Sequence, residues 1–131
     1  MTVLDGKPRL GVLICDDFQQ IREVFRDVIA REPTLEVAGE AADGAAAISE
    51  ARRLRPDVIL LDLAMPNVTG LEALPELRRI VPDARIIVVS GFATAVVADQ
   101  VRALGADGFV EKGADIDTIV SALIGEVALT D

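Results

Sequence analysis

The sequence predicts an α/β protein in which one parallel sheet carries helices on both faces. Short apolar runs alternate with amphipathic stretches along the chain, as in proteins built from strand–helix units. The runs Val58–Leu61 and Ile86–Val89 are continuously apolar, which is typical of central parallel strands buried on both faces. Turn residues such as Pro33, Pro56 and Gly105 separate the segments.

The strands are expected where apolar residues cluster in short runs bounded by turn residues. Five segments fit this pattern: Leu10–Ile14, Leu35–Ala41, Val58–Leu61, Arg85–Ser90 and Gly108–Val110. Between and after them, apolar residues recur at helical spacing, which predicts one amphipathic helix per segment. The five apolar stripes run over Ile21–Ile29, Ala45–Leu54, Leu71–Val81, Val97–Leu104 and Ile116–Val127.

Pro75 interrupts the third helical stripe. A proline inside a helix removes one backbone hydrogen bond and costs about 3 kcal/mol. Either this helix begins later than its apolar stripe indicates, or it is kinked at the proline.

Composition narrows the functional classes. The 131 residues are 51% apolar, enough for one core and little more than one domain. The net charge of −9 opposes direct binding to nucleic acid. The chain has no histidine, which excludes a Ser-His-Asp triad and a phosphohistidine of its own. The single cysteine, Cys15, excludes an internal disulfide. With no signal peptide and no membrane-spanning apolar run, we expect a cytoplasmic protein without membrane contact.

Polar residues follow four of the predicted strands. Asp16 and Asp17 come after the first strand and Asp62 after the third, while Ser90 ends the fourth and Lys112 follows the fifth. Ligands of such sheets bind outside the carboxyl ends of the strands, so these side chains are expected to share one edge. Singly, each has a simpler explanation: an aspartate that caps the first helix, or a polar residue at the surface.

The three carboxylates would repel one another, and a hard divalent cation removes that conflict. Mg²⁺ prefers oxygen ligands and is often held by one or two carboxylates together with a phosphate; Mn²⁺ is an alternative. Asp62, on the central strand, is the best candidate for a nucleophile that forms an acyl phosphate. Lys112 and Ser90 would then neutralise the phosphoryl oxygens.

These residues lie in four short motifs: CDDF, LLDLAMPNVTG, VVSG and GFVEKG. Together they resemble the receiver domain of two-component response regulators, and most nearly the receivers of LuxR/NarL-type transcription regulators. The resemblance implies a leader at 1–8, a receiver domain at 9–127 and a tail at 128–131. It also implies a flavodoxin-like, CheY-like doubly wound fold of three layers, with five parallel strands in the order 2-1-3-4-5 and five helices.

The resemblance implies that a sensor histidine kinase or a phosphotransfer protein donates a phosphoryl group to Asp62. Mg²⁺ would be bound by Asp17, Asp62 and the backbone carbonyl of Ala64, with Asp16 nearby. The protein would be a phosphoacceptor switch, catalysing only its own phosphorylation and dephosphorylation, rather than an enzyme acting on other substrates.

The resemblance also assigns the switch. Lys112 would pair with the phosphoryl group, Ser90 would move toward it, and Phe109 would change rotamer. The surface of the fourth helix, fifth strand and fifth helix would then change shape for a downstream protein or a fused output domain. Dimerisation through this surface is a further alternative that no single residue indicates.

Several positions depart from the commonest receiver pattern. Gly113 follows Lys112 where many receivers have proline, Ser90 replaces the commoner threonine, and Phe109 lacks a tyrosine hydroxyl. Ala64 and Phe92 are apolar at positions that flank the attacking water, so neither activates it. We therefore expect a slowly hydrolysing Asp62 phosphate.

The sequence leaves several alternative functions open. The chain is either a stand-alone receiver or the N-terminal receiver fragment of a helix-turn-helix transcription regulator. A flavodoxin-like electron carrier is disfavoured because CDDFQQ replaces a phosphate-binding loop and Tyr and Trp are absent. A phosphohydrolase would need a second acid where Ala64 stands. A phosphorylation-independent binding module would not need the complete set of polar residues.

Overall fold

The predicted sheet is present in the computed structural model, which describes residues 2–4, 7–91 and 95–125. Its parallel strands are β2 (Lys7–Cys15), β3 (Leu35–Ala41), β4 (Val58–Asp62), β5 (Arg85–Ser90) and β6 (Gly108–Glu111). They pair in the spatial order β3-β2-β4-β5-β6. Counting only the parallel strands, this confirms the predicted order 2-1-3-4-5.

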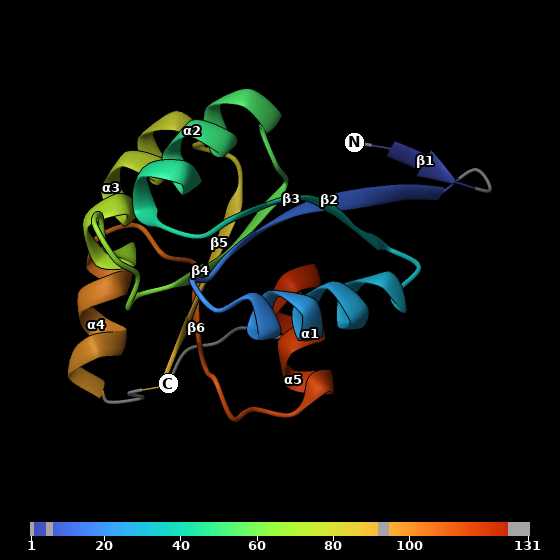
Figure 1. The fold of residues 1–131 in the computed structure, drawn as a ribbon. Coiled ribbons are helices and arrows are strands. Elements are labelled where there is room, and N and C mark those ends of the chain that lie inside the picture. The colour runs from blue at the N-terminus through green and yellow to red at the C-terminus, as the bar shows by residue number, and fades with distance from the viewer. Residues whose placement is uncertain (1, 5–6, 92–94, 126–131) are drawn as a thin grey trace.

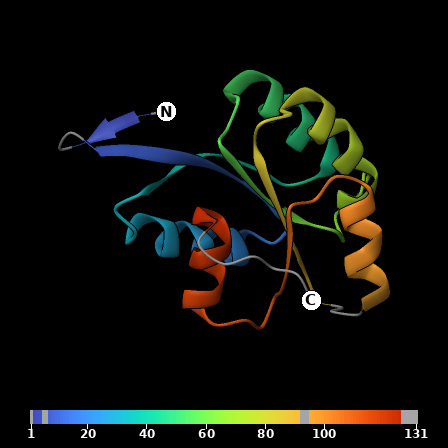
Figure 2. The same ribbon diagram turned by 180° about the vertical axis from the view of Figure 1, so that it is seen from behind.

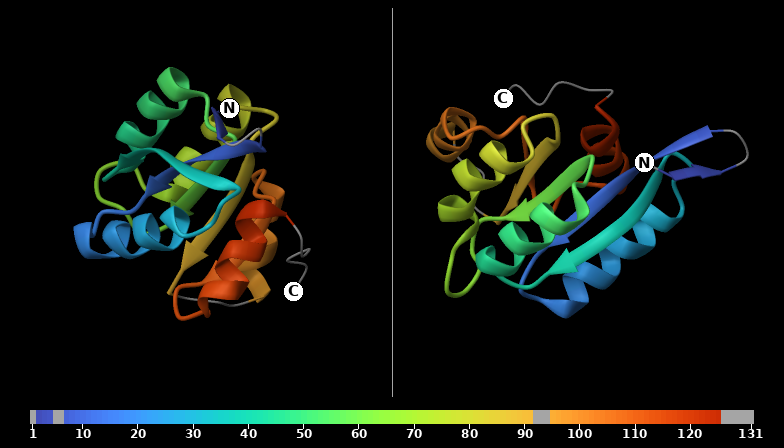
Figure 3. Two further views of the ribbon diagram at one scale, coloured as in Figure 1. Left: turned by 90° about the vertical axis from the view of Figure 1, so that its right-hand side faces the viewer. Right: turned by 90° about the horizontal axis from the view of Figure 1, so that it is seen from above.

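Five helices cover the two faces of the sheet, which confirms the three layers (Figures 1 and 2). They are α1 (Gln19–Ala30), α2 (Gly44–Leu54), α3 (Gly70–Ile80), α4 (Ala95–Ala103) and α5 (Ile116–Ile124). Helices α2, α3 and α4 lie on one face, and α1 and α5 on the other (Figure 3).

Alternation along the strands divides the core into two clusters. Leu13, Ile59 and Leu61 point to the α2–α3–α4 face, where they join Leu74 and Leu77 of α3 among others. The alternate residues of the central strands point to the opposite face, against the apolar stripes of α1 and α5; these are Val12, Ile14, Val58, Leu60, Ile87 and Val89. Because successive strand side chains alternate between faces, a continuous apolar run fills both clusters at once.

The N-terminal segment contains a strand that the sequence pattern did not predict. β1 (Thr2–Leu4) pairs antiparallel with Lys7–Arg9, so β2 begins three residues before the expected Leu10. β1 and the start of β2 project beyond the helices (Figures 1 and 2). A strand of three residues is too short to give a periodic pattern. Part of the predicted leader at 1–8 is therefore paired with the sheet.

Helix α3 runs through Pro75 instead of beginning after it. Thr69 caps the helix: its hydroxyl accepts the Glu72 N–H at 3.1 Å, and the Glu72 carboxylate accepts the Thr69 N–H at 3.1 Å. This reciprocal capping box satisfies two otherwise unpaired donors. The proposal that the helix begins later than its apolar stripe is wrong. Pro75 lies on the exposed face of α3, away from the core.

The last helix ends at Ile124, and Gly125 caps it in the left-handed region at φ 78°. The expected helical position Val127, and the tail at 128–131, lie outside the described residues. Within the parts of the chain that the structure describes, no helix is long and apolar enough to cross a membrane.

Candidate functional site

The acidic pair lies directly beyond the end of β2. Asp16 is buried, with 1% of its surface exposed. Its N–H donates to the Ala41 carbonyl at 3.0 Å, and its Oδ1 accepts the Phe18 N–H at 3.0 Å. The N-cap of α1 is Phe18, without a side-chain cap bond. Neither Asp16 nor Asp17 is therefore the helix cap that the sequence left as an alternative.

Asp62 is the last residue of β4 and is 3% exposed. Its Oδ1 accepts the Ala64 N–H at 3.3 Å. The loop that follows folds back tightly, since Gly70 N–H donates to the Leu63 carbonyl at 3.0 Å. A Cβ on Gly70 would lie 1.9 Å from the Asp62 carbonyl oxygen. Only glycine lets the start of α3 approach the end of β4 this closely, and this contact fixes the backbone at Asp62.

Lys112 reaches the acidic residues from beyond β6. Its backbone N–H donates to the Ser90 carbonyl at 2.9 Å, which fixes the start of the loop. Its Nζ lies 3.3 Å from Oδ2 of Asp16 and 3.3 Å from Oδ2 of Asp62. Ser90, 6% exposed, ends the neighbouring strand β5. The structure therefore brings together Asp16, Asp62, Ser90 and Lys112 at the expected edge of the sheet.

The electrostatics of the site follow from burial and from this charge arrangement. Burial raises the pKa of Asp62, and the Asp16 carboxylate raises it further. Lys112 opposes both effects but does not cancel them. Burial works to lower the pKa of Lys112, but Asp62 and Asp16 together raise it above its ordinary value. The lysine therefore remains protonated between carboxylates that lack sufficient counter-charge.

The carboxylate cluster fits a divalent cation. One oxygen from each of Asp16, Asp17 and Asp62 lies within 4.8 Å of the others. Asp16 Oδ2, Asp17 Oδ1 and Asp62 Oδ2 are buried and accept no hydrogen bond of good geometry, although Lys112 faces two of them. Buried polar atoms normally have partners. Carboxylate oxygens in this arrangement are the donors that Mg²⁺ and Mn²⁺ prefer.

The remaining predicted residues lie around this cluster. Ala64 is exposed next to Asp62. Phe109, on β6, is partly buried against the core cluster on the α2–α3–α4 face. Phe92 lies outside the described residues.

Sequence reasoning missed Arg22 of α1. Its Nη1 donates to the Asp16 carbonyl at 2.8 Å, and its Nε donates to Glu40 Oε1 at 3.0 Å. The sequence carried only a weak signal for this contact. Arg22 lies in the first turn of the predicted helix, and helical side chains lean toward the N-terminus, here toward the end of the preceding strand. Glu40, its partner on β3, is 18 residues further along the chain and could not be identified without the fold.

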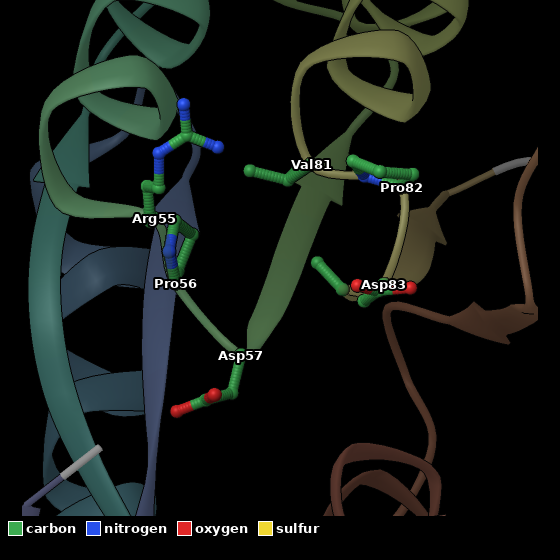
Figure 4. Close-up of a pocket in the computed structure, with 7 residues that line it drawn as sticks. Arg55, Pro56, Asp57, Val81, Pro82 and Asp83 are labelled. Carbon is green, nitrogen blue, oxygen red and sulfur yellow. The ribbon is translucent and has the colours of Figure 1, made fainter.

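A separate surface depression lies at the opposite end of the sheet (Figure 4). The turns 55–57 and 81–84 line it, ahead of β4 and β5. Asp57 contributes a carboxylate there, but its Oδ2 already accepts the Gly11 N–H at 2.8 Å and ties the turn before β4 to the middle of β2. The depression does not include any residue of the acidic cluster.

Comparison with known proteins identifies the family. The sequence model of the response regulator receiver domain family matches residues 12–124. The chain belongs to the response regulator receiver domain family. It is 37% identical over 113 residues to the chemotaxis protein CheY of Thermotoga maritima, covering 86% of this chain and 92% of that protein.

Other receivers agree with the LuxR/NarL-type resemblance. The receiver domain of the putative response regulator NarL from Mycobacterium tuberculosis superposes with a TM-score of 0.85 at 30% identity, covering 90% of this chain and 95% of that one. The transcriptional regulatory protein DegU of Brevibacillus brevis is 34% identical over 115 residues, 88% of this chain. The chain spans about half (49%) of DegU.

Proposed function

We propose that this receiver domain is a phosphoacceptor switch in which Asp62 takes up the phosphoryl group. The observation that carries the proposal is the position of Lys112 Nζ, 3.3 Å from Oδ2 of both Asp62 and Asp16, beside three converging carboxylates. A cation held between two buried acids can move from carboxylate to phosphoryl oxygens when negative charge is added.

Asp62 is favoured over Asp16 as the nucleophile by its hydrogen bonds. Asp16 Oδ1 is held by the Phe18 N–H at 3.0 Å, whereas the Ala64 N–H lies 3.3 Å from Asp62 Oδ1. In the reaction, an Asp62 oxygen forms a bond to phosphorus while the bond from phosphorus to the donor breaks, and the donor keeps the electron pair. The donor we propose is a sensor histidine kinase or a phosphotransfer protein.

A Mg²⁺ ion, or Mn²⁺ in its place, would be held by Asp17 and Asp62, with Asp16 nearby and the Ala64 carbonyl as a further oxygen. When bound, it supplies positive charge for the phosphoryl oxygens. The protein residues do the rest. Lys112 carries the second positive charge, and the tight contact at Gly70 keeps Asp62 at the end of its strand.

The response is proposed to pass through Ser90 and Phe109. The Ser90 hydroxyl would bind a phosphoryl oxygen, and Phe109 would rearrange within the partly buried site that it occupies against the core. The surface of α4, β6 and α5 would then bind a downstream protein or a fused output domain. This switch role, rather than turnover of an external substrate, is the function that the site supports best.

The decisive test is incubation with acetyl phosphate and Mg²⁺, followed by intact-mass measurement. We expect one phosphoryl adduct on the wild type and none on Asp62→Asn. Asp27→Asn, on the exposed side of α1, is the matched control and should be labelled like the wild type. An unlabelled wild type that also fails to bind beryllofluoride would refute the proposal.

A further inference from the structure

Arg22 holds the backbone that joins the two acidic residues. Its Nη1 donates to the Asp16 carbonyl oxygen at 2.8 Å, and its Nε donates to Glu40 Oε1 at 3.0 Å. The Arg22 side chain is only 17% exposed, so this bridge from α1 to β3 passes mostly beneath the surface. Neither contact involves a carboxylate of the cation site.

The bound carbonyl belongs to the peptide unit between Asp16 and Asp17. A peptide unit is planar, so fixing its oxygen fixes the tilt of the plane from which both aspartates extend. The preceding peptide is held separately, because the Asp16 N–H donates to the Ala41 carbonyl at 3.0 Å. Arg22 therefore constrains the relative directions of Asp16 and Asp17.

Glu40 keeps the guanidinium of Arg22 in place. Its other oxygen, Oε2, lies 2.6 Å from Nη2 of Arg26, one helical turn further along α1. Arg26 Nε also donates to Oε2 at 2.8 Å. The carboxylate is thus fixed by two arginines, and the planar guanidinium of Arg22 needs little further ordering to reach the carbonyl.

We propose that Arg22 is a positioning residue for the cation site. By orienting the Asp16–Asp17 peptide it presets the carboxylates for a divalent cation. This inference rests on the proposed function, which supplies the cation. The charge of Arg22 alone has the opposite effect, since a nearby positive charge repels Mg²⁺. Positioning and charge therefore predict opposite changes in affinity when the arginine is removed.

The experiment is calorimetric titration of the unphosphorylated full chain with Mg²⁺ and with Mn²⁺. Arg22→Met is expected to weaken binding about tenfold, the lower end of the range for residues that orient metal ligands. Arg31→Met removes a like charge at the end of the same helix, but it leaves both arginine contacts of Glu40 and the bond to the Asp16 carbonyl intact. It should bind the cation as tightly as the wild type or more tightly. Arg22→Lys keeps the charge without the forked geometry and should also weaken binding.

A second readout separates positioning from general loss of structure. The Asp17 amide belongs to the peptide that Arg22 holds, so its NMR signal should shift in metal-free Arg22→Met and stay unchanged in Arg31→Met. If Arg22→Met does not fold, Arg22→Lys serves for both measurements. Unchanged affinity in a folded Arg22 variant would overturn this inference alone. A wild type that binds neither cation would overturn the cation site of the proposed function.

Discussion

Replacing Asp62 with asparagine should stabilise the metal-free protein. The substitution keeps the size and shape of the side chain but removes one buried negative charge. In the folded state that charge faces two other carboxylates and one lysine. Functional sites often carry such unfavourable arrangements at a cost in stability.

The magnitude follows from the distances. At the 4.8 Å limit of the cluster, each neighbouring carboxylate repels Asp62 by about 3.5 kcal/mol at an effective dielectric constant of about 20. Lys112 at 3.3 Å attracts it by about 5 kcal/mol on the same scale. The two repulsions exceed the attraction by about 2 kcal/mol, and the desolvation of a buried carboxylate acts in the same direction. We expect Asp62→Asn to raise the free energy of unfolding by about 2 kcal/mol.

The effect should depend on pH in a defined direction. The pKa of Asp62 is raised by burial and by Asp16, so the unfolded state ionises first as the pH rises. The destabilisation by Asp62 is absent below the ordinary aspartate pKa of about 3.9, and it develops as the pH rises through the higher folded pKa. The advantage of Asp62→Asn should therefore be largest at neutral pH and disappear in acid.

Urea unfolding in EDTA at neutral and acidic pH measures this difference. Asp27→Asn on the exposed side of α1 should change stability by less than about 0.5 kcal/mol. Added Mg²⁺ should stabilise the wild type and narrow the gap, because a ligand stabilises the state that binds it. If Asp62→Asn is no more stable than the wild type in EDTA at neutral pH, Lys112 compensates the cluster fully and the argument is wrong.

Three further outcomes are expected. Gly70→Ala should lower the free energy of unfolding in urea by about 3 kcal/mol, because overpacking against backbone is costly. Gly113→Ala, with no atom near its Cβ position, should change the free energy of unfolding little. Equal losses in the two variants would contradict the steric argument. Asp115→Ala should lower the unfolding midpoint at neutral pH, since Asp115 caps α5 and its bonds to Thr118 lower its pKa. The loss of stability should shrink as the pH falls through that lowered pKa. A loss that does not depend on pH would argue against the charged cap. Ala64→Asn should speed loss of the Asp62 phosphate about fivefold if its amide donates a hydrogen bond worth about 1 kcal/mol to the attacking water; an unchanged rate would remove the basis for expecting a long-lived phosphate.

The sequence by itself determined the sheet, its helices and the edge at which the polar residues gather. Short apolar runs and helical spacing are local properties of the sequence. The rule that ligands bind outside the carboxyl ends of parallel strands converts them into a location. The sequence therefore predicted the shared edge of four residues, because each follows or ends a strand that the apolar pattern locates. These are Asp16, Asp62, Ser90 and Lys112.

Only the tertiary structure decided which groups contact one another within that edge. The bridge from Glu40 through Arg22 to the Asp16 carbonyl depends on how α1 packs beside β3, and Lys112 reaches two carboxylates only because β6 and β4 flank β5. Similarly, the sequence does not show why position 70 needs glycine, because the close approach of the Asp62 carbonyl appears only in the folded structure. Such contacts join residues distant in sequence, so strand order and packing set them, and no local pattern carries that information.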